Sequence, residues 1–227
     1  GAEDYFVNNF LDDPGIVRLN AGSINAFTSD YTFYWFDYLA GYDTLLAQAG
    51  WNHTLNQDIA LVRGAANMQN KSWGLIVTWK YRNPPYLDNA NSILEQMRTA
   101  YECGAEYIVI FNYASMDGNY YGTMTDEHFQ ALETFWNTVV TNPAVVHGSV
   151  TAEAVLVLPA HYAWGMRNPE DKIWGFWGAD ENSTTIWNIS RQLLDEYGSG
   201  LDIVYGDTRF PVTGKYQKIY YWDDTIS

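Results

Sequence analysis

The chain has 227 residues, of which 47% are hydrophobic, and it contains 10 Trp and 18 Tyr. This length and composition allow one large core or two small ones and exclude a disordered polypeptide. The net charge of −15 argues against nucleic acid or an anionic membrane surface as a partner, because both would repel the chain. No run of 18 or more apolar residues occurs, so we expect no membrane span.

The first predicted strand is the short apolar run at residues 16–19, and a helix over residues 31–39 follows it. Ser29 is a good N-cap, and Gly41 stands where a helix takes a left-handed glycine after its last turn. Beyond this glycine, the apolar run at residues 44–47 is typical of a strand buried on both faces. Two parallel strands cannot be joined by so short a link, since a parallel crossover needs about a dozen residues. We therefore predict a helix, a glycine stop and a strand.

The same order of strand and helix recurs along the next hundred residues. Apolar periodicity predicts helices over residues 56–69, 91–103 and 126–140, with Thr125 as the N-cap of the last, and apolar runs predict strands from about residues 74 and 107. The spacing between strand starts is close to thirty residues, which is typical of a β/α barrel. Four such units predict half of a TIM-type barrel over residues 1–148.

A different pattern follows the polar segment at residues 141–148. Apolar strands at residues 154–158 and 201–205 flank a helix that begins near Ser183 and ends at Gly198, which predicts a βαβ unit. Residues 216–222 add a third strand. These elements predict a small flavodoxin-like or Rossmann-like domain over residues 149–227, without a G-x-G-x-x-G phosphate loop. The alternative is one closed barrel that recruits the later strands, which would have seven strands instead of eight.

Polar and aromatic residues follow the predicted barrel strands, where a β/α barrel forms its ligand site. They are Gln48, Trp51, Asn52, His53, Trp79, Lys80, Tyr81, Asn112 and Tyr113. Sugar rings stack on Trp and Tyr, and sugar hydroxyls need amide or ammonium partners, so this set predicts a carbohydrate ligand. The alternative is that the polar side chains only satisfy loop backbone groups, with Lys80 paired to a loop acid.

The loop at residues 161–177 leaves the first strand of the second domain, where open α/β sheets bind ligands. Its Trp164, Arg167 and Asp171 predict either a sugar subsite or a clamp between the domains, and an Arg167–Asp171 pair would hold the loop in both cases. The four histidines show no metal-ligand spacing, so we expect no metal and no cofactor. The single cysteine, Cys103, excludes an internal disulfide and lies in a helical pattern typical of a buried thiol.

The order of motifs resembles a known family. WNH follows one strand, TWKY the next and FNY the third, and a flavodoxin-like domain comes after them. This order resembles the C-terminal part of barrel glycoside hydrolases, including β-galactosidase-like enzymes and uncharacterised glycosidase-like proteins. The resemblance implies a carbohydrate substrate or ligand and a pair of catalytic carboxylates.

The predicted strand ends carry no carboxylate, because they fall at Asn20, Gln48, Lys80 and Asn112. The catalytic residues therefore stay unassigned, and only acids from loops are available as recruits: Asp88, Asp117, Asp171 and Asp180. Two function classes remain open. The chain is a glycoside hydrolase, or it is a non-catalytic carbohydrate-binding or cell-surface interaction protein.

A half barrel leaves two unpaired strand edges and exposed apolar core residues, both of which favour association with another chain. We therefore expect an oligomer or pairing with a complementary half-barrel chain. Asn-x-Ser/Thr sequons occur at Asn52, Asn70, Asn182 and Asn188, and they would be glycosylation acceptors in a secreted protein. With the acidic, lysine-poor and aromatic-rich composition, they favour an extracellular or cell-surface location.

Overall fold

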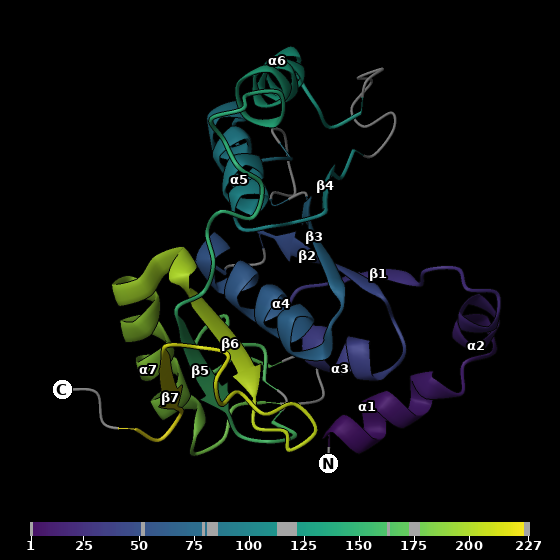
Figure 1. Ribbon diagram of the computed structural model, residues 1–227, viewed down its shortest axis with the longest axis vertical. Helices are drawn as coiled ribbons and strands as arrows, with labels where there is room; N and C mark the ends of the chain where they lie inside the picture. The colour runs from purple at the N-terminus through teal and green to yellow at the C-terminus, as the bar shows by residue number, and fades with distance from the viewer. Residues whose placement is uncertain are drawn as a thin grey trace.

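The chain forms an α/β structure with two parallel sheets (Figure 1). The computed structural model describes residues 2–50, 53–78, 80, 86–112, 122–162, 164–172 and 178–224. The four-stranded sheet has the order β1 (Phe27–Asp30), β2 (Thr44–Ala49), β3 (Ser72–Val77) and β4 (Tyr107–Ile110). In the three-stranded sheet, β5 (Ala154–Leu158) lies between β6 (Leu201–Tyr205) and β7 (Lys218–Tyr221). The predicted α/β class is confirmed, and neither sheet closes into a barrel within the described residues.

The helices alternate with these strands after two N-terminal helices. They are α1 (Ala2–Leu11), α2 (Pro14–Ala21), α3 (Tyr34–Leu39), α4 (Leu55–Gln69), α5 (Ala90–Glu102), α6 (Asp126–Phe135), which continues as a π-turn (Trp136–Val140), and α7 (Ser183–Tyr197), which is followed by a short 3₁₀ turn (Gly198–Gly200). Side-chain caps set the starts of α4 and α5, because Thr54 accepts from the Gln57 amide and Asn89 from the Ser92 amide. None of the described helices is long and apolar enough to cross a bilayer.

The prediction of a first strand at residues 16–19 is wrong, because these residues belong to α2. Pro14 stands at the start of this helix, where its fixed φ favours helical backbone. The Asp13 carboxylate accepts from the next free amides, those of Gly15 (2.8 Å) and Ile16 (3.2 Å). The strand that pairs with β2 is β1, so Asn20 lies on a helix and Asp30 ends the first strand.

Helices cover one face of the four-stranded sheet and leave part of the other exposed. Leu45, Ala47 and Leu75 point to the helical side and are wholly buried. On the opposite face, large apolar side chains of β1, of β4 and of the residue after β4 are 36–46% exposed: Phe27, Tyr107, Val109 and Phe111. We call these four residues the open apolar face.

The open apolar face is concave. The rings of Phe27 and Tyr107 lie 5.2 Å apart, although they come from the first and fourth strands. A flat sheet would separate these strands by about 14 Å. Gly74 lies between them in the register, and a Cβ there would come within 2.5 Å of the Tyr107 carbonyl oxygen. The ring contact therefore indicates a strongly curved sheet.

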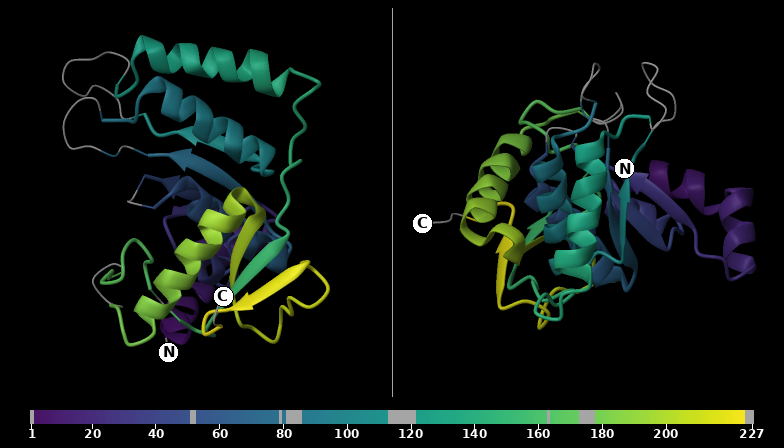
Figure 2. Two further views of the ribbon diagram at one scale, coloured as in Figure 1. Left: turned by 90° about the vertical axis from the view of Figure 1, so that its left-hand side faces the viewer. Right: turned by 90° about the horizontal axis from the view of Figure 1, so that it is seen from above.

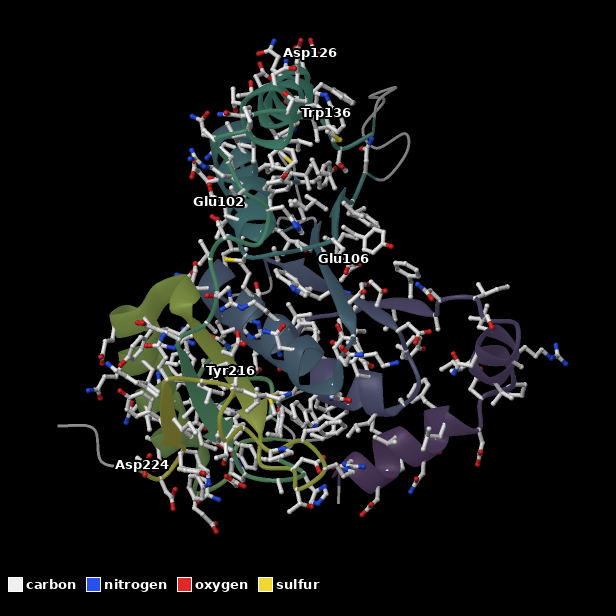
Figure 3. All side chains as sticks on the ribbon, viewed as in Figure 1. Glu102, Glu106, Asp126, Trp136, Tyr216 and Asp224 are labelled. Atoms are coloured by element: carbon white, nitrogen blue, oxygen red, sulfur yellow. The ribbon has the colours of Figure 1, made fainter. Side chains whose placement is uncertain are left out.

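Helix α4 joins the two sheets, because it packs on β2 and β3 and also on β6 (Figure 1). Its buried Arg63 donates from Nε to Asp202 Oδ1 (2.7 Å) and from Nη2 to the carbonyls of Ser199 (2.7 Å) and Leu201 (3.0 Å). Tyr216, in the loop before β7 and labelled in Figure 3, donates to the other oxygen of Asp202 (2.9 Å). One hydrophobic core runs through both sheets. Helices α5 and α6 pack together at the end of the molecule far from β7 (Figure 2).

Candidate functional site at the carboxyl edge of the four-stranded sheet

Asp30 ends β1 and is buried at the carboxyl edge of the sheet. Its Oδ1 accepts from the backbone amides of Tyr31 (2.5 Å) and Thr32 (3.4 Å), so the turn after β1 fixes the carboxyl group in place. Burial raises the pKa of Asp30 to about 6, although these amide hydrogen bonds work in the opposite direction. A carboxyl group with this pKa exchanges its proton near neutral pH.

Asp37, on α3, lies beside Asp30 and is also buried. Burial, together with repulsion from Asp30, raises the pKa of Asp37 well above its ordinary value, and the two carboxyl groups are hydrogen-bonded to each other. Because two adjacent carboxylates in a core cannot both ionise, Asp37 carries the proton and donates it to Asp30. The second oxygen of Asp37, Oδ2, has no hydrogen-bond partner among the described residues.

Two hydroxyl groups near this pair are also left without partners in the described part of the chain. They belong to Thr32 and Tyr34, whose side chains are buried. Burial raises the pKa of Tyr34, and the neighbouring acidic groups of Asp58, Asp30 and Asp37 raise it further, so the four groups share one region. A buried polar atom without a partner costs free energy, which makes the cluster a candidate ligand site.

His53 and Asp58 form a second buried pair at the same edge, from the loop after β2 and the first turn of α4. His53 Nδ1 lies 2.8 Å from Asp58 Oδ1, and Nε2 lies 2.8 Å from the carbonyl oxygen of Gly165. Since Nε2 must donate to a carbonyl, a further proton lies between Nδ1 and Oδ1. Burial raises the pKa of Asp58 and the charge of His53 opposes that shift, while Asp58 Oδ2 has no partner among the described residues.

Lys80 follows β3 and is one of the predicted site residues. Its Nζ lies 3.5 Å from Asp88 Oδ2, and its charge also lowers the pKa of Asp58. The pairing with Asp88 is the alternative that the sequence left open. About a third of the Lys80 side chain remains exposed, so the ammonium can still reach a ligand.

The other described rim residues hold the edge together. Gln48 Nε2 donates to Ser29 Oγ (3.0 Å) and so links β2 to β1. Asn112 Oδ1 accepts from the amides of Thr123 (2.8 Å) and Met124 (3.3 Å) and fixes the chain before α6. Asn112 therefore satisfies backbone groups, as expected if the polar rim residues only satisfy the loop backbone. Five of the predicted site residues lie outside the described residues: Trp51, Asn52, Trp79, Tyr81 and Tyr113.

The loop after β5 reaches across to this edge. The predicted Arg167–Asp171 pair is present, with Nη2 2.7 Å from Oδ1, and Arg167 also lies over the ring of Tyr31 at 4.9 Å. Gly165 has room for no side chain, because a Cβ would lie 2.0 Å from Asp171 Oδ2. These contacts fit the clamp interpretation. Trp164 is buried and its Nε1 has no partner in the described residues.

The acids that sequence reasoning missed are Asp30, Asp37 and Asp58. The sequence does not mark Asp30 as a strand end, because the run Phe27–Asp30 has only one apolar residue. The loop acids that the sequence offered as catalytic residues have other partners. Asp88 pairs with Lys80, Asp171 with Arg167, and Asp180 accepts from Tyr162 Oη at 2.8 Å. Asp117 lies outside the described residues. Within the described residues, no three His, Cys, Asp or Glu side chains are placed to hold a metal ion.

No family model, curated protein or solved structure matches this chain. The geometry of the carboxyl edge therefore carries the functional argument.

Proposed function

We propose that this chain binds a carbohydrate at the carboxyl edge of its four-stranded sheet, as half of a glycoside-hydrolase-like β/α barrel. The observation that carries the proposal is Asp30 at the end of β1, beside buried Asp37, Tyr34 and Asp58 oxygens that lack partners among the described residues. Hydroxyl-rich ligands supply donors and acceptors for such groups. The aromatic and ammonium groups predicted at this edge would complete the site.

Strand order supports the half barrel. The four strands are parallel and follow one another in chain order, with helices on one face, as in a β/α barrel. Curvature and the open apolar face agree with this, because the interior of a barrel is lined by large apolar side chains. The order β6-β5-β7 corresponds to the first three strands of a flavodoxin-like sheet, which has the order 2-1-3 there.

The chemistry of the edge suits an acid catalyst, but its geometry also favours a second candidate function. A carboxyl group with a pKa of about 6 can serve as a general acid. Glycoside hydrolysis, however, needs two carboxyl groups about 5 Å or more apart, and Asp30 and Asp37 are hydrogen-bonded to each other. That contact favours the alternative of a binding protein without turnover, unless Asp58 or a second chain supplies the other carboxylate.

Calorimetry with ligands chosen from a glycan array tests the binding proposal. We expect Lys80→Ala to weaken binding at least tenfold, about 1.4 kcal/mol, because the exposed ammonium would lose its contact with a hydroxyl or carboxylate of the ligand. Lys215→Ala is the matched control, since Lys215 is an exposed lysine on the loop before β7. Trp51→Ala should weaken binding similarly. Unchanged affinity in both Lys80→Ala and Trp51→Ala, or no bound glycan on the array, contradicts the proposal.

Hydrolysis of aryl glycosides separates the enzyme from the binding protein. Turnover by the intact chain that disappears in Asp30→Asn would assign the acid role to Asp30. Glycan binding without turnover would assign the chain to the non-catalytic class. The extracellular location stays a prediction, which detection of glycans at the sequons in the native protein would support.

A further inference from the structure

A small cavity lies at the carboxyl ends of β5 and β6, away from the four-stranded sheet. Its volume is about 330 Å³, and its lining includes Glu3, Trp35, His161, Tyr205, Asp207 and Arg209. Open α/β sheets bind their ligands outside the carboxyl ends of the strands. The volume is at the lower limit for small-molecule sites, so it suits a ligand of about monosaccharide size.

A carboxylate of the chain itself occupies this position. Glu3, on α1, is 9% exposed, and its Oε1 accepts from Arg209 Nη2 at 2.8 Å. Its other oxygen, Oε2, is paired with His161 Nδ1. One carboxylate thus bridges the loop after β5 and the loop after β6, although α1 precedes all of the strands in the chain.

Arg209 is also held by a contact that does not involve Glu3. Arg209 Nε donates to both oxygens of Asp207, at 2.9 and 3.0 Å, and this contact lowers the pKa of Asp207. His161 has left-handed backbone, with φ of +61°. Trp35 and Tyr205, whose side chains are buried, line the same cavity. Arg209 and His161 are therefore positioned to meet the two oxygens of one carboxylate.

We propose that this cavity is a binding site for a small carboxylate, such as a carboxylated monosaccharide, and that Glu3 occupies it as an internal competitor. Asp207 beside Arg209 disfavours a doubly charged phosphate, because it would repel the second negative charge. The ligand would displace Glu3 from Arg209 and His161, and the apolar contacts of α1, such as that of Phe6 with Phe33 at 5.1 Å, would have to loosen. The ring of Trp35 or Tyr205 would then face the ligand.

Titration calorimetry with glucuronate tests this proposal. Removal of the competing charge in Glu3→Gln should tighten glucuronate binding at least tenfold relative to the wild type, because a tethered group competes at an effective concentration in the millimolar range. Adding Arg209→Gln to this variant should abolish the binding. The control is Glu133→Gln, which removes one exposed acidic charge from α6 and should leave the affinity unchanged.

Two further probes decide the chemistry of the ligand. Glucose tests whether the carboxylate is needed, and inorganic phosphate tests whether any anion suffices; both should bind at least tenfold more weakly than glucuronate to Glu3→Gln. In the wild type, saturating glucuronate should increase amide hydrogen exchange in α1. Absence of glucuronate binding by folded Glu3→Gln, equal binding of glucose or phosphate, binding that survives loss of Arg209, or unchanged exchange in α1 would each overturn the proposal.

Discussion

At the scale of single residues, Asp30 and Asp37 depart furthest from what a core usually accepts. Two contacts stabilise this buried pair. The backbone amide of Tyr31 holds Asp30 in place, and the protonated Asp37 donates a hydrogen bond to Asp30. Nearby Tyr34 and Asp58 are buried as well, and neither is a cation that could neutralise the pair. The cluster therefore stores electrostatic free energy that folding has to offset.

The pH dependence of stability tests this account of Asp30. Its pKa of about 6 in the folded chain lies above the ordinary value of 3.8, so the folded state holds more protons between these pH values. Stability should therefore be fully present below about pH 4 and fall as the pH rises through 6. Asp30→Asn should not show this loss. Relative to the wild type, its free energy of unfolding should therefore be about 2 kcal/mol higher at pH 7.5 than at pH 4.5.

Urea unfolding at the two pH values measures this difference. Asp12→Asn, at an exposed position, is the matched control and should follow the wild type. An Asp30→Asn protein with the same pH dependence as the wild type would show that Asp30 is ionised without cost.

At the scale of elements, α4 decides how the two sheets pack. Its Gly64 lies against β6, where an added Cβ would come within 2.7 Å of the Ile203 carbonyl oxygen and 3.0 Å of Val204 Cγ1. Arg63, next to it, forms its ion pair with Asp202 across the same contact. A helix-weakening glycine in the middle of α4 is thus explained by close packing.

Gly64→Ala should destabilise the chain by about 1 to 3 kcal/mol, since overpacking at the α4–β6 contact outweighs the gain of about 1 kcal/mol in helix propensity. Gly200→Ala is the control, because its Cβ would meet only Glu153 Cγ at 3.8 Å. Thermal and urea unfolding measure both. A Gly64→Ala protein as stable as the wild type would mean that α4 and β6 can move apart at little cost.

At the scale of the whole molecule, the open apolar face and the two outer strands of the four-stranded sheet are exposed, and we expect another chain to cover them. Two copies related by a two-fold axis along the strands would place β4 of each beside β1 of the other and give the eight strands of a closed barrel. We therefore expect a dimer with twice the chain mass of 25.9 kDa. Light scattering at micromolar concentration measures this mass.

Val109→Glu on the open apolar face should convert the dimer into a monomer. Trp136→Glu is the control, because Trp136 is also an exposed apolar residue (60%) but lies in the turn that follows α6, away from the four-stranded sheet's open face (Figure 3). A wild-type monomer would contradict pairing with a second copy and would leave a complementary half-barrel chain as the cover. A dimer that persists in Val109→Glu would place the interface elsewhere.

The sequence by itself determined the elements with strong local signals. Helices α4 to α7 follow from apolar periodicity, with the predicted N-cap Thr125 before α6, and β5 and β6 follow from apolar runs bounded by glycine or polar residues. Gly41 and Gly104 end helices with φ of +106° and +93°, as a left-handed stop requires. These features depend on neighbouring residues, so they can be predicted without the fold.

Only the tertiary structure decided the first strand and the acidic cluster. The run at residues 16–19 is more apolar than Phe27–Asp30, yet Asp13 and Pro14 start a helix there, and pairing with β2 selects the shorter, more polar strand. Asp37 and Asp58 resemble ordinary helix-surface acids in the sequence. They become buried partners of Asp30 and His53 because packing, which depends on residues far apart in the chain, sets how much water each carboxyl group keeps.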